Sequence, residues 1–226
     1  MSKKTWIIII VLIVGFFGFF LLTGNSKDDN NGANNSGSGT PKKIVADDHV
    51  TGSKDNKIVL MEYFDFECPA CQGLYPTLEA VRTKYGDKVT FVQRYFPLTS
   101  IHQNALASAR AGEAAGKQGK FFEMEKLLFD NQDTWKTPVT SGDAQKIFEG
   151  YAKELGLNID QYKKDYASGE TLTRINRDRS SGSKLGITGT PTIFLNGEKI
   201  TIKEKTDIAN AIDKAISENK TDPNQK

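Results

Sequence analysis

The sequence predicts an α/β domain behind an N-terminal membrane-spanning segment. A dense run of β-branched and aromatic residues, Ile58–Phe66, predicts a strand buried on both faces, and an amphipathic helix follows it directly. Val89–Phe96 then predicts a second strand. A strand, a helix and a strand in this order form a βαβ unit, whose crossover makes the two strands parallel.

The beginning of the chain predicts a transmembrane signal anchor over residues 1–24. Lys3 and Lys4 precede an uncharged apolar run, Trp6–Leu22, and the neutral stretch of about 20 residues covers roughly 30 Å as a helix. A cleaved signal peptide is the alternative, although Leu21–Ser26 makes a poor cleavage site. By the positive-inside rule, we expect a single-pass protein of the cell membrane with a cytoplasmic N-terminus and an extracytoplasmic domain.

Composition predicts a linker and one domain after the anchor. Residues 25–43 are expected to be a disordered linker, because Asn, Gly, Ser, Asp and Lys bury too little apolar surface to offset the entropy of ordering. The domain is expected over residues 44–218, followed by a flexible tail at 219–226. The 30 Lys and Arg nearly balance the 28 Asp and Glu, and their signs alternate along the chain, so no nucleic-acid footprint is indicated.

Helical periodicity accounts for most of the domain. The first apolar stripe runs to Tyr85 and is closed by Gly86, with Pro76 expected to kink the helix. Further helices are predicted at 103–116, 119–130, 141–155 with Ser141 as its cap, 158–166 and 171–185. Because that is too much helix for one crossover, we expect an inserted helical subdomain at about 103–185.

The chain then returns to the sheet. Ile187–Leu195 predicts a strand, Asn196-Gly197 a two-residue hairpin turn, and Lys199–Ile202 the returning strand. Apolar residues at helical spacing from Ile208 to Ile216 predict a final amphipathic helix. Helices are therefore expected to flank a central sheet.

The only two cysteines occupy Cys68-Pro69-Ala70-Cys71, on the turn between the first strand and its helix. Pro69 suits the first turn of a helix, and the helix N-terminus would point its free N–H groups at Cys68. That arrangement favours the thiolate, which is the reactive form of cysteine. The spacing therefore predicts redox chemistry at this pair.

The sequence supports other roles for these cysteines and for the two histidines less well. A structural zinc site needs four ligands, and the chain has no third cysteine and only His49 and His102. A purely structural disulfide would close a ring too small to stabilise the fold much. A Cys-His hydrolase would need an oxyanion hole that the sequence does not indicate. We expect His102 to cap or pack at the start of the helical section, and His49 to lie in a loop or at the surface.

Several short segments, in order from residue 48 to about 200, are similar to signatures of one family. They are Asp48–Gly52, Glu62–Cys71, Arg94–Leu98 with His102–Ala105, Gln118–Phe122, and Gly186–Thr192. A CxxC at the end of a strand in a βαβ unit suggests the thioredoxin fold. Together the segments resemble the DsbA-like thiol-disulfide oxidoreductases of the thioredoxin superfamily, and among them the membrane-anchored, BdbD-like branch.

The resemblance assigns roles to individual residues. It makes Cys68 the exposed nucleophile and Cys71 its buried resolving partner. Pro191 matches a cis-proline that faces the disulfide, so Thr190 before it could pair with an extended substrate peptide. Glu62 matches a buried acid that could exchange protons with Cys71. Beside Pro69, Ala70 stands where the best-known members have a histidine, which implies a less acidic Cys68 and a less oxidising disulfide.

The implied activity is that of an extracytoplasmic thiol-disulfide oxidoreductase, which donates the Cys68–Cys71 disulfide to secreted or surface proteins during oxidative folding. Its expected partners are cysteine-containing unfolded proteins and, by resemblance, a membrane-embedded quinone-coupled thiol oxidase. No cofactor, metal or nucleic acid is implied, and a monomer is expected. A disulfide reductase or isomerase is the alternative favoured by Ala70 and Thr190, and a chaperone-like peptide-binding module is another.

Overall fold

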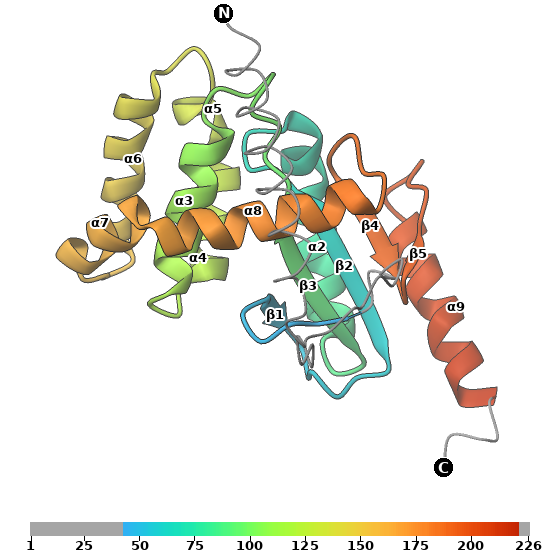
Figure 1. Ribbon diagram of the computed structural model, residues 1–226. Coiled ribbons are helices and arrows are strands. Elements are labelled where there is room, and N and C mark those ends of the chain that lie inside the picture. The colour runs from blue at the N-terminus through green and yellow to red at the C-terminus, as the bar shows by residue number, and fades with distance from the viewer. Residues whose placement is uncertain (1–42, 222–226) are drawn as a thin grey trace, which may run out of the picture. The chain divides into compact units, whose positions relative to one another are not determined.

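The computed structural model describes residues 43–221, in which a mixed five-stranded sheet is flanked by helices (Figure 1). The strands β1 (His49–Thr51), β2 (Ile58–Phe64), β3 (Val89–Tyr95), β4 (Thr192–Leu195) and β5 (Glu198–Lys199) lie in the order β1-β3-β2-β4-β5. Strands β2 and β3 are parallel, while the other neighbouring pairs are antiparallel. The predicted βαβ unit therefore forms the centre of the sheet.

Strand β2 is buried along its whole length, as its apolar run predicts. Because side chains alternate across a strand, its two faces enter different cores. Ile58 and Leu60 pack with α2 (Pro69–Tyr85) and α9 (Asp207–Thr221), whereas Val59, Met61 and Tyr63 pack on the opposite face. Glu62 is two residues after Leu60, so its side chain lies on the same face of the sheet, which is the face that α2 covers.

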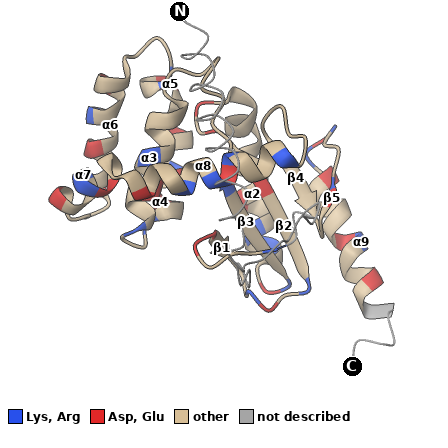
Figure 2. Cartoon of the chain, viewed as in Figure 1, with Lys and Arg blue, Asp and Glu red and all other residues tan. Residues whose placement is uncertain are grey.

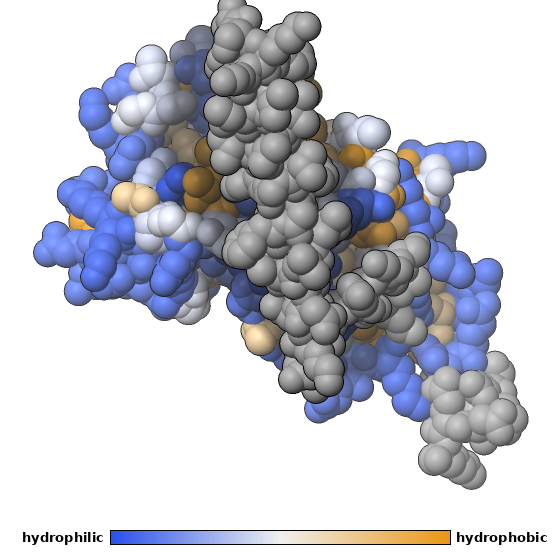
Figure 3. Space-filling view, viewed as in Figure 1, coloured by the Kyte–Doolittle hydropathy of each residue, from blue (hydrophilic) through white to orange (hydrophobic). Residues whose placement is uncertain are grey.

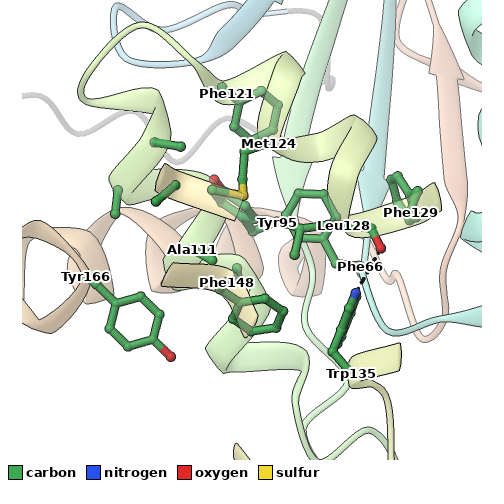
Figure 4. Close-up of a cluster of buried hydrophobic side chains, with 14 of the residues drawn as sticks. Phe66, Tyr95, Ala111, Phe121, Met124, Leu128, Phe129, Trp135, Phe148 and Tyr166 are labelled. Carbon is green, nitrogen blue, oxygen red and sulfur yellow. Dashed lines mark hydrogen bonds between the residues drawn. The ribbon is translucent and has the colours of Figure 1, made fainter. Parts of the chain in front are cut away.

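The helical section between β3 and β4 contains α3 to α8. Their bounds are α3 (Ala105–Gly116), α4 (Phe121–Asp130), α5 (Gln132–Trp135), α6 (Ser141–Glu154), α7 (Ile159–Ala167) and α8 (Gly169–Lys184). Its core is continuous with the end of β2 through Phe64 and Phe66. Figure 4 shows the aromatic rings that meet there, and the bond that the Trp135 indole N–H donates to Leu128 O at 3.0 Å. The core of the helical section therefore extends onto the sheet at the ends of β2 and β3, beside the two cores on the faces of β2.

Helix α8 crosses from the helical section to the sheet (Figure 1). Its charged residues gather near that crossing (Figure 2), where Arg174 pairs with Asp178 and also contacts Asp47 ahead of β1. Gly182 lets the helix approach closely, since an added Cβ would lie 2.7 Å from the Phe96 ring and 3.1 Å from that of Tyr63. Hydrophilic residues cover most of the outer surfaces of α6, α7 and α9 in the face drawn in Figure 3.

Several local predictions were wrong. Thr140 rather than Ser141 caps α6, because its side chain accepts the Asp143 N–H. Gly86 ends α2 with a right-handed φ of −59°, so it is not the left-handed cap that its position suggested. The returning strand was predicted at Lys199–Ile202 but comprises only Glu198–Lys199. It begins directly after the turn at Asn196 and Gly197 and pairs with the last two residues of β4.

Two further differences concern elements that sequence patterns do not mark well. The short β1 and α5 were not anticipated, and His49 lies in β1 with its Nε2 atom 2.7 Å from Glu113 Oε2, not free in a loop. The anchor predicted at 1–24 and nearly all of the linker lie outside the described residues. Within residues 43–221 no helix is both long and apolar enough to cross a membrane.

Glycine substitutions test the close approach of α8. Gly182→Ala should lower the free energy of unfolding by about 1–3 kcal/mol, because the crowding of Phe96 and Tyr63 outweighs the better helix propensity of alanine. Gly150→Ala, in the middle of α6 with nothing within 4 Å of the added Cβ, should raise it by about 0.5–1 kcal/mol. Urea denaturation measures both, and a stabilised Gly182→Ala protein would contradict the packing described.

Candidate active site

The site is built at the start of α2, where Cys68 is the N-cap residue and Pro69 the first helical residue. Cys68 has extended φ and ψ of −69° and 121°, so its side chain lies at the end of the helix and not along its flank. Cys71 lies one turn further on and is 1% exposed, against 6% for Cys68. Both side chains are therefore buried, and the expectation that Cys68 is exposed is wrong, because the Gly189–Thr192 segment covers it; Cys68 is only the less enclosed of the two.

The Gly189–Thr192 segment supplies the opposite wall of the site. The Thr190–Pro191 peptide bond is cis, and the Cys68 thiol donates a hydrogen bond to Thr190 O across 3.3 Å. Strand β4 begins at Thr192 and is antiparallel to β2, which brings this segment to the end of β2 from which the cysteines follow. The structure therefore brings Cys68, Thr190 and Pro191 together from opposite ends of the domain.

The thiols have opposite acid-base character. A hydrogen bond from the Cys71 thiol, helped by the backbone N–H groups of Cys71 and Ala70, lowers the pKa of Cys68 to about 5 against the opposing effect of burial. Burial, the hydrogen bond to Cys68 and the charge of Glu62 raise the pKa of Cys71 well above its ordinary value. Near neutral pH, Cys68 is a thiolate and Cys71 a thiol.

Thr190 contributes through its hydroxyl as well as its backbone. A carbonyl accepts hydrogen bonds and can stabilise only the protonated Cys68, whereas a hydroxyl can donate to the thiolate. Thr190 Oγ1 is buried and has no hydrogen-bond partner among residues 43–221, and it is among the groups that lower the pKa of Cys68. Its free donor is therefore available once Cys68 loses its proton.

Glu62 lies on the sheet beneath α2. It is 3% exposed and pairs in register with Gln93 of β3, whose side chain bonds its carboxyl group. Burial raises the pKa of Glu62 to about 7, although the nearby Arg82 guanidinium opposes the shift. Arg82 itself is 2.7 Å from Glu125 Oε2 of α4, so a buried charge cluster links the sheet, α2 and the helical section. Glu62 can therefore hold or release a proton near neutral pH.

Two more buried carboxyl groups, Asp65 and Glu67, fix the turn that leads into Cys68. Asp65 accepts backbone N–H groups from Glu67 and Leu98, both at 2.9 Å, while its own carbonyl accepts the Cys68 N–H at 3.1 Å. Glu67 Oε1 accepts the Thr137 N–H and hydroxyl, each at 2.7 Å. The turn is therefore held both to the sheet and to the helical section.

An open groove of about 590 Å³ runs beside the cysteines. It is lined by Ala70, Gly73 and Leu74 of α2, by Pro191, Thr192 and Ile193, and by residues 199–205. Ala70 is exposed in the groove, whereas Cys71 is buried. A peptide lying there would contact Ala70, which lies between the two cysteines in sequence, and Pro191.

Comparison with known proteins identifies the family. The family model described as thioredoxin matches residues 45–214. The chain belongs to the thioredoxin family. Alpha-DsbA1 from Wolbachia pipientis is 26% identical and superposes with a TM-score of 0.67 over 77% of this chain and 94% of its own. BdbD from Bacillus subtilis, at 21% identity, has the same fold, with a TM-score of 0.67 over 78% and 96% of the two chains.

Curated relatives of higher identity are much longer proteins. The Na(+)/H(+) antiporter NhaA 1 of Mycolicibacterium vanbaalenii is 40% identical over 152 residues, which make up 66% of this chain and 23% of that protein. The chain thus spans about a quarter of the length of these relatives, whose matched part is the size of the thioredoxin-family domain alone. The predicted membership of the DsbA-like group of the thioredoxin superfamily is confirmed.

Sequence reasoning placed the main site residues but missed their supporting contacts. Cys68, Thr190 and Pro191 lie together, and Glu62 is buried beneath the helix that holds Cys71. The roles assigned to these residues remain predictions. The contacts made by Asp65 and Glu67, and by His102 with its Nδ1 atom 2.7 Å from Asp65 Oδ2, were not anticipated. The only sequence signal for them was polarity in an apolar run.

Thr190→Val should raise the pKa of Cys68 by about one unit, because a donor to the thiolate is lost while the backbone carbonyl stays in place. Thiolate absorbance at 240 nm during a pH titration of the reduced protein measures the change. Thr188→Val, at an exposed position in the same loop, is the matched control. An unaltered titration in the Thr190 variant would exclude the hydroxyl as a donor.

Glu62→Gln should flatten the dependence of stability on pH. The folded pKa of about 7 exceeds the ordinary value of 4.5, so the native state binds more protons than the unfolded state between these pH values and its stability falls as pH rises. The full effect is about 3 kcal/mol, by conversion of the shift. Denaturation at pH 5 and pH 8 measures it, with Glu154→Gln on the surface as control; an equal fall in the Glu62→Gln protein would refute the assignment.

Proposed function

We propose that this protein is an extracytoplasmic thiol-disulfide oxidoreductase that donates the Cys68–Cys71 disulfide to secreted or surface proteins. The observation that carries the proposal is the contrast between the two thiols, one acidic at the rim of the site and one buried and hard to ionise. The acidic thiol is a good leaving group, and the buried one is shielded from external nucleophiles.

Disulfide donation begins with a substrate thiolate that attacks Cys68 Sγ. The Cys68–Cys71 bond breaks, a mixed disulfide forms between the substrate and Cys68, and Cys71 leaves as a thiolate. Because its pKa is well raised, Cys71 takes up a proton, which Glu62 can supply, since it is a buried acid with a pKa of about 7 whose charge acts on Cys71. Thr190 and Pro191 hold the substrate peptide beside Cys68 during this step.

A second substrate thiolate then attacks the substrate sulfur of the mixed disulfide, and Cys68 leaves as a thiolate. The substrate has lost two electrons and two protons; the protein has gained both electrons, with one proton on Cys71 and the other released to solvent. Lowering the Cys68 pKa from 9.0 to about 5 stabilises the reduced form at pH 7. The gain is at most about 60 mV of oxidising potential, less where solvent screens the open rim.

The proposed location rests on the amino-acid sequence of residues 1–24, which has the length and charge pattern of a signal anchor. An oxidising compartment is where a disulfide donor can act. Cysteine-containing unfolded proteins are the proposed substrates, bound along the groove beside Ala70. Reoxidation of the dithiol is assigned, by family resemblance, to a membrane-embedded quinone-coupled thiol oxidase.

Reduction or isomerisation is the second candidate, and Ala70 is the observation that favours it. With no imidazole inside the dipeptide, the thiolate lacks one stabilising charge, which shifts the couple toward reduction. The two candidates differ in the sign of net electron flow at the same pair of sulfurs. The redox potential of the couple therefore decides between them.

Cysteine variants and the redox potential test the proposal. Cys71→Ser should accumulate mixed disulfides on Cys68, and Cys68→Ser should lose disulfide exchange altogether. At pH 7 the wild-type Cys68 should be alkylated at least roughly 100-fold faster than Cys71, because only its thiolate is the dominant form. Mass spectrometry of trapped and alkylated peptides measures both results.

Equilibration with glutathione gives the potential. A value near the roughly −120 mV of a strong oxidant supports donation, whereas one near the roughly −270 mV of thioredoxin would assign the protein to reduction. Biological activity that survives in Cys68→Ser would instead indicate a chaperone-like peptide-binding module.

A further inference from the structure

His102 lies outside the cysteine motif and outside the mechanism given above, yet it is attached to the same turn. The residue follows β3, in the loop that leads to α3, and its side chain is 15% exposed. Its Nδ1 atom is 2.7 Å from Asp65 Oδ2, and the carbonyl of Asp65 accepts the Cys68 N–H. One residue thus joins the imidazole to the backbone of the nucleophile.

Hydrogen bonding fixes which nitrogen of His102 can take up a proton. An ionised carboxylate only accepts hydrogen bonds, so Nδ1 carries the hydrogen that it donates to Asp65. Asp65 also accepts two backbone N–H groups, one at each carboxylate oxygen, so both oxygens already act as hydrogen-bond acceptors. Protonation therefore occurs at Nε2 and turns His102 into a cation beside Asp65.

A cation at this position changes the charge balance around Cys68. The Asp65 and Glu67 carboxyl groups precede Cys68 in the chain, and both side chains are buried. Glu67 is satisfied by Thr137 and Asn104, which carry no charge. Without a positive charge, two carboxylates would oppose ionisation of Cys68.

We propose that His102, held by Asp65, is the positioning residue that stabilises the Cys68 thiolate in place of the histidine absent at Ala70. The inference rests on the proposed disulfide exchange at Cys68. The charged groups that act on His102 agree with it. The Asp65 carboxylate, through its hydrogen bond and its charge, raises the pKa of His102, and Cys68 and Glu67 add to the shift. If the Cys68 thiolate favours the imidazolium, the imidazolium favours the thiolate by the same factor.

The pH window follows from the direction of that shift. The pKa of His102 is raised, so the imidazolium and its effect are present at lower pH and are lost as pH rises through that folded pKa. Cys68 ionises near pH 5. Thiolate and imidazolium therefore coexist from about pH 5 to somewhat above the ordinary histidine pKa of about 6.5.

The test is a histidine titration by NMR in the reduced and oxidised full-length protein. The chain has two histidines, so His49 serves as an internal control in the same spectra, and His102→Gln assigns the signals. Oxidation to the disulfide removes the thiolate. We expect the proton affinity of His102 to fall up to about tenfold on oxidation, the low end of the effect of an opposite charge, while that of His49 stays unchanged.

A variant gives the reciprocal measurement. His102→Gln keeps a donor for Asp65 but cannot carry a charge, so it should raise the Cys68 pKa by up to about one unit. The equilibrium with glutathione should then shift five- to tenfold toward the disulfide at pH 6–7, roughly 20–30 mV, and should match wild type at pH 9. His49→Gln is the matched control.

The outcomes separate this inference from the proposed function. If His102 titrates identically in both redox states, or if His102→Gln leaves the Cys68 pKa unchanged, the inference is wrong even though disulfide exchange continues. Equal shifts for both histidines would indicate a general structural change and would also overturn it. If the wild-type protein shows no disulfide exchange, the proposed function itself is wrong.

Discussion

The site depends on keeping a negative charge stable on Cys68 among three buried carboxyl groups. Glu62, Asp65 and Glu67 precede the cysteine in the same strand and turn, and none is more than 3% exposed. Like charges at short range would raise the pKa of any thiol placed there. The helix N-terminus alone offers only partial charges, so each carboxyl group has to be neutralised or satisfied locally.

Each carboxyl group is neutralised or hydrogen-bonded in a different way, and the partners come from different parts of the domain. Glu62 holds a proton until about pH 7 and so is largely uncharged when Cys68 ionises. Asp65 has His102 as its ionisable partner. Glu67 accepts backbone and hydroxyl groups at both oxygens, from Thr137 and from Asn104. The side-chain partners differ, but the groups are linked, because the Glu67 N–H donates to the Asp65 carboxylate and Glu67 also acts on His102.

The same hydrogen bonds explain why the helical section sits where it does. The Gln132 side chain of α5 donates to Phe66 O at 2.6 Å and to Cys68 O at 3.2 Å, so the section binds the active-site turn directly. Removing it would leave Glu67 and these carbonyls without their donors, and would expose the aromatic core around Phe66. The helical section is therefore a structural part of the site, in addition to any surface it offers a substrate.

Local sequence patterns were sufficient to predict the regular secondary-structure elements around the site. Dense runs of β-branched and aromatic residues predicted β2 and β3, and the spacing of apolar residues predicted α2. The place of Glu62 beneath the helix came from the family resemblance and not from a local pattern. Residues distant in the chain were not predictable in this way, because Asp65 and His102 are 37 residues apart and His49 and Glu113 are 64 apart. Thr140 and Ser141 can both cap a helix, so the sequence could not show which of them is the N-cap of α6 without the backbone conformation.

Contacts between distant parts of the chain also affect what Ala70 implies about the oxidising strength of the disulfide. Inferring a weak oxidant from a dipeptide without histidine assumes that the charge stabilising the thiolate must come from within the motif. Electrostatic stabilisation depends on distance and surroundings, and a residue of another loop can supply it equally well. The pKa of Cys68 is lowered to about 5 with Ala70 in place, through the Cys71 thiol, the Thr190 side chain and the backbone N–H groups of Cys71 and Ala70, so an acidic thiol does not require a histidine in the dipeptide. Under the proposed role of His102, a charge from another loop is added to these contributions, and the dipeptide alone would then not determine the direction of electron flow.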